Sequence, residues 1–276
     1  MSSILVKEIE CKSILCKSGL ADYALNCYTG CQHGCLYCYA RFMGRFTGDI
    51  LPWGSFVYVK ANALDVLKKQ VRKAKKGNVF ISSVCDGWQP PEGKYKLTRQ
   101  CLEVLLENDF SVTILTKNTL ILRDFDVLSS KKTLVHLGMT VTTLKDKLAR
   151  DIEPGAPLPQ KRLKILEEAG NLGITIYAFL GPLMPYLSDS EEDIDALFKA
   201  IKPLNLAYIY IDALNPRWGV WPSVKALLLH KYPSLVEKYQ NILFHNPTRI
   251  AYLENFKLVI QKLASHYGIL DKLKFC

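Results

Sequence analysis

The sequence Cys31-Gln-His-Gly-Cys35-Leu-Tyr-Cys38-Tyr39 places three thiols within eight residues. Thiolate is the soft ligand that selects iron–sulfur clusters, zinc or copper(I). Three protein thiolates leave one iron of a cubane cluster open, and an open iron coordinates a substrate or cofactor. Gly30 and Gly34 relax the backbone so that the sulfurs can converge. The loop therefore predicts a metal centre with an open position for chemistry.

A zinc site is the alternative for this loop. Cys27 lies four residues before Cys31, so Cys27, Cys31, Cys35 and Cys38 also fit a zinc knot of four thiolates. Zinc ribbons usually contain two separated C-x2-C pairs, and this chain has only one. We therefore favour the cluster and keep a non-catalytic, zinc-bound nucleic-acid-binding module as an alternative.

The C-x3-C-x-aromatic-C pattern resembles the cysteine motif of the radical S-adenosylmethionine (SAM) enzymes. Similarity continues from about Lys12 to the final helix and points to the spore photoproduct lyase group, or DNA repair photolyase-like proteins. The stretches that carry this resemblance are Tyr23–Cys31, Ile81–Asp86, Gln89–Pro91, Leu115–Lys117 and Glu153–Gly155.

This resemblance implies an enzyme with two cofactors, a 4Fe-4S cluster on Cys31, Cys35 and Cys38, and SAM on the open iron. The reduced cluster would split SAM into methionine and a 5′-deoxyadenosyl radical that abstracts hydrogen from the substrate. An electron donor such as ferredoxin or flavodoxin is implied as a partner. The protein would aim the radical and exclude water and oxygen.

Composition narrows the class of protein. The chain has 276 residues, is 49% hydrophobic and lacks an apolar run of about eighteen residues or more, so we expect no membrane span. The stretch Met1 to Lys17 lacks a signal-peptide core. We therefore expect a cytoplasmic protein, whose nine cysteines serve metal binding or chemistry rather than disulfides.

The formal net charge is +10, which permits a nucleic acid or another anionic substrate. Solvated helix faces explain such a charge equally well, and the chain contains no compact basic arm. A peptide or small-molecule substrate therefore stays open as the alternative.

Apolar runs alternate with helical patterns, which predicts a parallel sheet with crossover helices. Six units match the partial (β/α)6 TIM-type barrel with C-terminal helices that the resemblance implies. We expect a lead-in over residues 1–22, the barrel over 23–214 and a helical extension over 215–276. The expected strands are Ala24–Tyr28, Val79–Val84, Ser111–Leu115, Leu134–Met139, Ile174–Leu180 (ended by Gly181-Pro182) and Leu206–Ile211.

Ligands collect at the carboxyl ends of parallel strands. Besides the cysteine loop, strand ends here carry Cys85, Asp86, Lys117, two threonines and Gly181. By resemblance, Lys117 pairs with the SAM carboxylate, and a solvated loop lysine is the alternative. Asp86 either caps the following turn or binds the cofactor. Gly181 either lets the backbone approach the adenine closely or simply ends its strand.

Three further residues complete the predicted cofactor site. Tyr37 is fixed by the motif and is expected to pack near the adenine. Thr140 and Thr142 alternate on one side of a strand and could bond the ribose hydroxyls, although β-propensity explains threonines there as well.

Tyr39 and Cys85 are the catalytic candidates. Photoproduct lyases place a tyrosine of the hydrogen-transfer path where Tyr39 lies. Their hydrogen-donating cysteine aligns with Ser83, two residues before Cys85, an offset that keeps the side-chain face. Cys85 either quenches a radical or packs near SAM, and the offset argues against true photoproduct repair.

The remaining cysteines carry weaker signals. Cys11, Cys16 and Cys27 are too loosely spaced to favour a second cluster, and Cys101 is expected to be buried in a helix. His33, inside the cysteine loop, either bonds the cluster edge or faces solvent.

Overall fold

The computed structural model describes residues 4–46 and 51–276, and its main sheet has eight strands in the order β11-β10-β9-β8-β7-β6-β3-β2. The six central strands run parallel, which confirms the predicted partial barrel. They are β3 (Tyr23–Leu25), β6 (Asn78–Ile81), β7 (Ser111–Thr116), β8 (Val135–Thr140), β9 (Thr175–Leu183) and β10 (Tyr208–Ala213).

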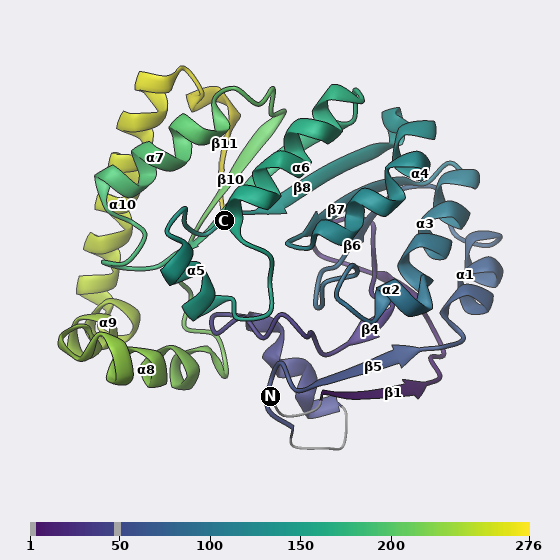
Figure 1. The fold of residues 1–276 in the computed structure, drawn as a ribbon, viewed down its shortest axis with the longest axis horizontal. Helices are drawn as coiled ribbons and strands as arrows, with labels where there is room; N and C mark the ends of the chain where they lie inside the picture. Colours follow the sequence, from purple (N-terminus) through teal and green to yellow (C-terminus); the bar gives the residue numbers. More distant parts are fainter. Residues whose placement is uncertain (1–3, 47–50) are drawn as a thin grey trace.

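Helices lie along the outside of this sheet, with α1, α3 and α4 toward one end and α7 and α10 toward the other (Figure 1). No helix of the described ranges is long and apolar enough to cross a bilayer. The helices are α1 (Ala63–Val71), α2 (Glu92–Tyr95), α3 (Leu97–Glu107), α4 (Phe125–Ser130), α5 (Asp146–Ile152), α6 (Pro159–Asn171), α7 (Glu191–Ile201), α8 (Val220–Lys231), α9 (Val236–Phe244) and α10 (Asn246–Tyr267).

The two faces of each strand differ in burial. Along β7, Val112, Ile114 and Thr116 are buried against the helices, whereas Thr113 and Leu115 are half-buried. Because side chains alternate with a period of two, the half-buried set faces the inside of the barrel. That set continues past the strand end, so the barrel interior opens toward residues at the strands' carboxyl ends.

Strands from both ends of the chain join the sheets. β2 (Leu15–Lys17) pairs antiparallel with β3, and β1 (Leu5–Ile9) pairs with β5 (Phe56–Lys60) in a smaller sheet. β11 (Leu273–Phe275) adds to β10, so a short strand follows the helices of the C-terminal segment. The division into lead-in, barrel and extension stays a prediction.

The expected first strand, Ala24–Tyr28, is wrong because the chain leaves the main sheet at Asn26. The Asn26 side chain accepts from the Val84 amide at 3.0 Å and donates to Ser83 Oγ at 2.8 Å. The next residues form β4 (Tyr28–Thr29) against β5 in the smaller sheet. The fifth strand also differs, since β9 continues through Gly181-Pro182 to Leu183.

Candidate active site

The cysteine loop follows β4 and is shaped by two glycines. Gly30 has φ +84°, and a Cβ there would lie 2.4 Å from the Phe56 carbonyl oxygen. Gly34 has φ +61°, and its amide donates to the Cys31 carbonyl at 3.2 Å. A second turn follows, in which the Cys38 amide donates to the Cys35 carbonyl at 3.2 Å. Two consecutive turns therefore gather the three thiols on one short loop.

The three thiols of this loop suit a metal cluster. Cys31 and Cys35 are buried, Cys38 is half-buried, and all three are free. Burial raises the pKa of each thiol, that of Cys35 to about 12. Backbone hydrogen bonds at Asp86 and Ala40 act in the opposite direction on the pKa of Cys31 and Cys38 but do not outweigh burial. A coordinating metal deprotonates a thiol outright, so this set of three soft, free thiols fits an iron–sulfur cluster.

Cys27 does not complete a zinc knot. Its sulfur is buried and lies 3.7 Å from the sulfur of Cys101 on α3, which is buried as predicted. Over residues 4–46 and 51–276, no three His, Cys, Asp or Glu side chains converge as ligands of a single ion. A cubane cluster is larger than an ion and spaces its ligands more widely.

Asp86 holds the loops after β6 and β7 against the cysteine loop. Its carboxylate accepts from Thr116 Oγ1 at 2.7 Å and from the Lys117 amide at 2.8 Å, and it lies 3.4 Å from His33 Nδ1. His33 Nε2 lies 2.9 Å from the Asn118 side-chain nitrogen. Burial lowers the pKa of His33, so its ring is neutral at pH 7. Of the two predicted roles, the geometry favours a structural one for Asp86.

Glu153 anchors the other side of the loop. The side chains of Glu153 and Arg162 are both 0% exposed and form an ion pair. The Tyr37 hydroxyl also donates to Glu153, as does Thr142 Oγ1 at 3.2 Å. Burial alone would raise the pKa of Glu153, but the Arg162 and Lys117 cations hold it below its ordinary value. Tyr37 is thereby fixed in the loop between Cys35 and Cys38.

The segment that carries Glu153 packs directly on the cysteine loop. The Gly155 amide donates to the His33 carbonyl at 3.0 Å. A Cβ on Gly155 would lie 2.3 Å from the Gln32 carbonyl oxygen, so only glycine fits. The loop is therefore supported by the barrel from two sides.

Lys117 is a half-buried cation just past the end of β7. Its ammonium lies 5.7 Å from the centre of the Tyr37 ring and makes no ion pair or hydrogen bond with any described residue. Burial would lower the pKa of Lys117, but Cys35 and Glu153 outweigh this and raise it. The ammonium is thus available to an anionic group in the barrel mouth.

Thr140, Thr142 and Gly181 lie at the same mouth. Thr140 is buried at the end of β8, and its carbonyl accepts from Arg162 at 2.9 Å. The Thr142 hydroxyl donates its hydrogen to Glu153, and its oxygen can still accept a hydrogen bond. A Cβ on Gly181 would lie 2.7 Å from Asp212 Cβ, so the side chain of Asp212 lies over this glycine.

Tyr39 contacts the loop after β6, and Cys85 is part of that loop. The Tyr39 hydroxyl donates to the Ser83 carbonyl, and its side chain is 40% exposed. Cys85 is buried, with its sulfur 3.7 Å from Asn26 Oδ1. Burial raises the pKa of Cys85 to about 12, so it carries its proton at pH 7. A protonated thiol is the form that has a hydrogen to give.

Two residues of the site escaped the sequence reasoning. Arg162 lies three, four and seven residues before Ile165, Leu166 and Ala169, all buried on one face of α6, and this spacing was the missed signal. Asp212 is a charged residue at the carboxyl end of the sixth strand, where the rule for parallel sheets already points.

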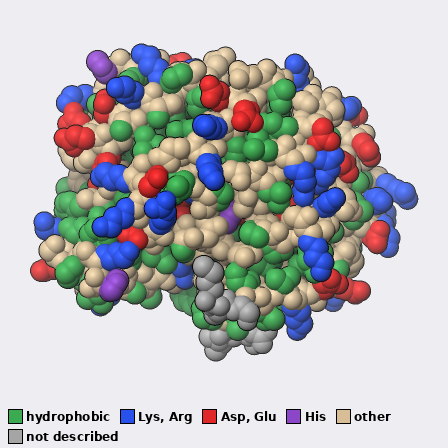
Figure 2. Space-filling model, in the orientation of Figure 1, with side chains coloured by type: hydrophobic (Ala, Val, Ile, Leu, Met, Phe, Trp, Pro, Cys, Tyr) green, Lys and Arg blue, Asp and Glu red, His purple; other side chains and the backbone are tan. Residues whose placement is uncertain are grey.

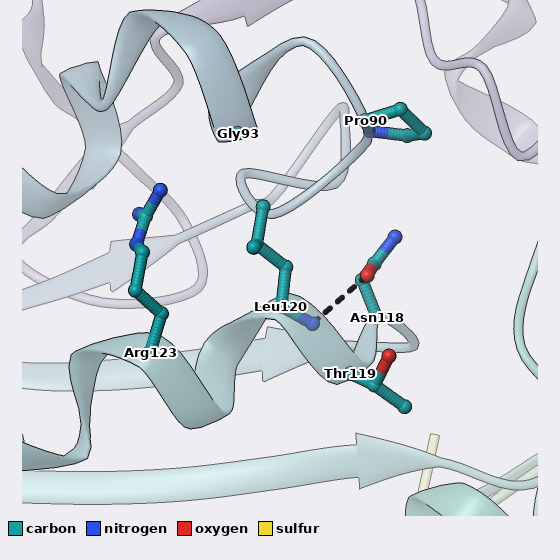
Figure 3. Close-up of a pocket in the computed structure, with 6 residues that line it drawn as sticks. All are labelled: Pro90, Gly93, Asn118, Thr119, Leu120 and Arg123. Carbon is teal, nitrogen blue, oxygen red and sulfur yellow. Dashed lines mark hydrogen bonds between the residues drawn. The ribbon is translucent and has the colours of Figure 1, made fainter.

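A hollow beside the loop after β7 is lined in part by Asn118, the residue after Lys117. It measures about 470 Å³, and Figure 3 shows Leu120 and Arg123 pointing into it. Arg123 is committed to Glu92 at 2.9 Å and Asp124 at 2.6 Å, and Asn118 accepts from the Leu120 amide at 3.0 Å. The guanidinium of Arg123, the charged group that lines this hollow, is therefore already paired within the protein.

Basic side chains do not mark a binding face by themselves. Figure 2 shows Lys and Arg distributed over the visible face, with Asp and Glu among them. On this face, the basic side chains behind the net charge of +10 are therefore not gathered into one patch.

The sequence profile of the Radical SAM superfamily matches residues 25–201. An uncharacterized protein of Methanocaldococcus jannaschii is 37% identical over 221 residues, which are 80% of each chain. A tyrosine-to-phenylalanine variant of spore photoproduct lyase has the same fold, with a TM-score of 0.69 at 13% identity over 98% of this chain and 81% of that one. A second variant, with bound AdoMet and dinucleoside spore photoproduct, gives 0.62 at 15% identity over 83% and 66%.

Proposed function

The chain belongs to the radical SAM superfamily of enzymes, and from this premise we propose that it binds a 4Fe-4S cluster through Cys31, Cys35 and Cys38 and cleaves SAM. The supporting observation is the set of three free thiols on one tight loop beside the unpaired Lys117 ammonium. When bound, the cluster supplies the electron that splits SAM into methionine and a 5′-deoxyadenosyl radical.

Residues of the barrel mouth bind and orient SAM in this proposal. Lys117 pairs with the SAM carboxylate, because its ammonium has no anionic partner among the described residues. Tyr37 offers its ring to the adenine and is fixed by Glu153. Thr140 and Thr142 accept from the ribose hydroxyls, and the backbone at Gly181, beside the side chain of Asp212, approaches the adenine.

Tyr39 and Cys85 serve the hydrogen transfers. The buried Cys85 thiol keeps its hydrogen at pH 7 and donates this hydrogen atom to a substrate radical, so that an S–H bond breaks, a C–H bond forms and the unpaired electron passes to the Cys85 sulfur. Tyr39 lies directly after Cys38 with an exposed ring, so it contacts a substrate that approaches the cluster loop.

The substrate of this proposal is a nucleic acid or another anionic molecule, since the chain carries a net charge of +10. Structures of spore photoproduct lyase contain a dinucleoside photoproduct, which supports the same substrate class here. A low-potential electron donor such as ferredoxin or flavodoxin delivers the reducing electron.

Iron analysis of cysteine variants tests the ligand assignment. After anaerobic reconstitution we expect about four irons per wild-type chain and a large loss in Cys31→Ala, Cys35→Ala and Cys38→Ala. Cys16→Ala is the matched control, because Cys16 is an exposed thiol outside the loop, and it should keep its iron. Full iron content in any of the three loop variants would remove that cysteine from the ligand set.

A further inference from the structure

A second hollow lies between the 3-10 helix η1 (Tyr39–Phe46) and the loop after β10. It measures about 280 Å³ and is lined by Tyr39, Phe42, Arg217 and Trp218. Trp218 is 57% exposed and Tyr39 40% exposed, so two large aromatic side chains stand open to solvent on either side of it. The Tyr39 hydroxyl is tethered to the Ser83 carbonyl, which fixes that ring in place.

Guanidinium groups accompany both rings. Arg217 Cζ lies 5.8 Å from the centre of the Tyr39 ring, and Arg45 Cζ lies 3.8 Å from that of Trp218. Arg217 makes no ion pair with any described carboxylate. Aromatic faces interleaved with arginines are the surface on which unstacked bases and their phosphates bind.

Asp212 lies on the strand that leads into the loop of Arg217 and Trp218, and it adds an acceptor on which Arg217 acts electrostatically. It lies on β10 two and four residues after Tyr210 and Tyr208, so it faces the barrel interior with them. Its carboxylate makes no hydrogen bond or ion pair across the described ranges, and Arg217 is among the cations that act on it. A half-buried acceptor without a partner calls for N–H donors from a ligand.

The size of the hollow limits what it can hold. Ligand sites usually measure about 300–1,000 Å³, so about 280 Å³ accommodates a single ring-sized group. A base inside a duplex cannot reach such a hollow without leaving the stack. A peptide side chain would stack as well, but it brings no phosphate for the arginines.

We propose that this hollow binds one unstacked base of a single-stranded nucleic acid, with its phosphate at Arg217 and its N–H edge at Asp212. The proposal rests on the proposed function and specifies its substrate. Because Tyr39 directly follows Cys38, the bound base lies beside the cluster loop.

The test measures fluorescence anisotropy of labelled dodecanucleotides on cluster-reconstituted protein at three salt concentrations. Trp218→Ala should weaken single-strand binding roughly tenfold or more. Arg217→Ala should reduce the slope of log affinity against log salt by about 0.7. DNA and RNA of one sequence, and the matching duplex, are separate arms of the test.

Two control variants match these changes at sites outside the hollow. Leu258→Ala removes an apolar side chain that is 65% exposed on α10, and Lys161→Ala removes an exposed cation on α6. Both should bind single strands within about twofold of wild type. A loss equal to that of the hollow variants would mean that the effect is not local.

Asp212→Asn tests the reading of the base edge. It keeps the shape of the side chain but replaces one acceptor oxygen with a donor. It should change the affinity ranking of dA, dC and dT dodecamers by roughly fivefold, whereas Trp218→Ala lowers all three alike. An unchanged ranking would remove Asp212 from the subsite.

Unchanged single-strand binding in Trp218→Ala and Arg217→Ala would overturn the proposal, as would tighter binding of the duplex. A labelled peptide that contains neither arginine nor phosphate is the last arm. If it binds tightly and competes with the oligonucleotide, the partner is a peptide and the proposal is overturned. The same preparations, reduced with SAM, are assayed for 5′-deoxyadenosine. If the wild type forms 5′-deoxyadenosine but the hollow variants bind single strands normally, only this inference is contradicted. If the hollow variants lose single-strand binding but the wild type forms no 5′-deoxyadenosine, only the proposed function is contradicted.

Discussion

The two sides of the barrel mouth hold carboxylates in opposite situations. Glu153, below the cysteine loop, is fully buried and bonded to Arg162, Tyr37 and Thr142. Asp212, across the mouth on β10, has no partner among the described residues. The pKa of Glu153 lies below its ordinary value because cations outweigh the effect of burial, whereas burial raises the pKa of Asp212 to about 6.

This difference distinguishes a carboxylate that supports the cysteine loop from a carboxylate that is free to bind a ligand. A buried charge that is paired and hydrogen-bonded offsets at least part of its desolvation penalty, and it fixes its neighbours, here the cysteine loop. A half-buried charge without a partner destabilises the folded chain, and such groups gather at functional sites. The Glu153 side is thus complete within the protein, and the Asp212 side is completed by a ligand.

Breaking the Glu153 side should have the largest effect. Arg162→Met leaves the Glu153 carboxylate buried and unpaired, which should lower the free energy of unfolding by about 3–5 kcal/mol. Denaturant unfolding of the protein measures this change. Arg150→Met on α5 is the matched control and should change stability by less than about 0.5 kcal/mol, because Arg150 is exposed.

A double variant sharpens the same test. Glu153→Gln with Arg162→Met removes both charges, so it should be more stable than Arg162→Met alone. A double variant that is less stable than Arg162→Met would mean that the pair is not the source of the loss.

The Asp212 side should respond in the opposite direction. Asp212→Asn removes the desolvated charge and should raise the free energy of unfolding by about 1–2 kcal/mol at pH 7.5, after allowance for solvent screening. Because the folded-state pKa is raised, wild-type stability falls as the pH rises from about 4 to about 6, and the gap to the variant opens over that window. Urea unfolding at pH 4 and pH 7.5 measures it. A gap of equal size at both pH values would contradict the account.

Lys117 joins the two sides as the unpaired cation of the mouth. Lys117→Met keeps the length of the side chain but removes its charge, so the dissociation constant for SAM should rise roughly tenfold while iron content is unchanged. Equilibrium dialysis with labelled SAM measures the affinity. Lys94→Met, at an exposed position on α2, is the control. Equal SAM affinity in both variants would remove Lys117 from the site.

Most of the fold could be predicted from local sequence patterns. Each parallel strand was visible as a short apolar run, and the Cys31–Cys38 loop was visible as a spacing. The break at Asn26 was not, because it depends on bonds to Val84 and Ser83, far away in the sequence. The edge strand β11 was missed since its three residues carry too little pattern.

Long-range pairing limited the prediction of the site in the same way. The motif Glu153-Pro-Gly155 was noticed, but its role required the position of Arg162 in three dimensions. Asp212 was within reach of the strand-end rule and was overlooked because no motif surrounds it. A residue that holds others in place is identified by its partners in the folded structure, and these partners are not neighbours in the sequence.

The most direct test of the account is the formation of 5′-deoxyadenosine by anaerobically reconstituted wild-type protein, reduced with dithionite in the presence of SAM and followed by liquid chromatography with mass detection. The account predicts 5′-deoxyadenosine and methionine in equal amounts, and neither from Cys35→Ala. A wild-type protein that carries its full iron content, binds SAM and yields no 5′-deoxyadenosine would contradict it.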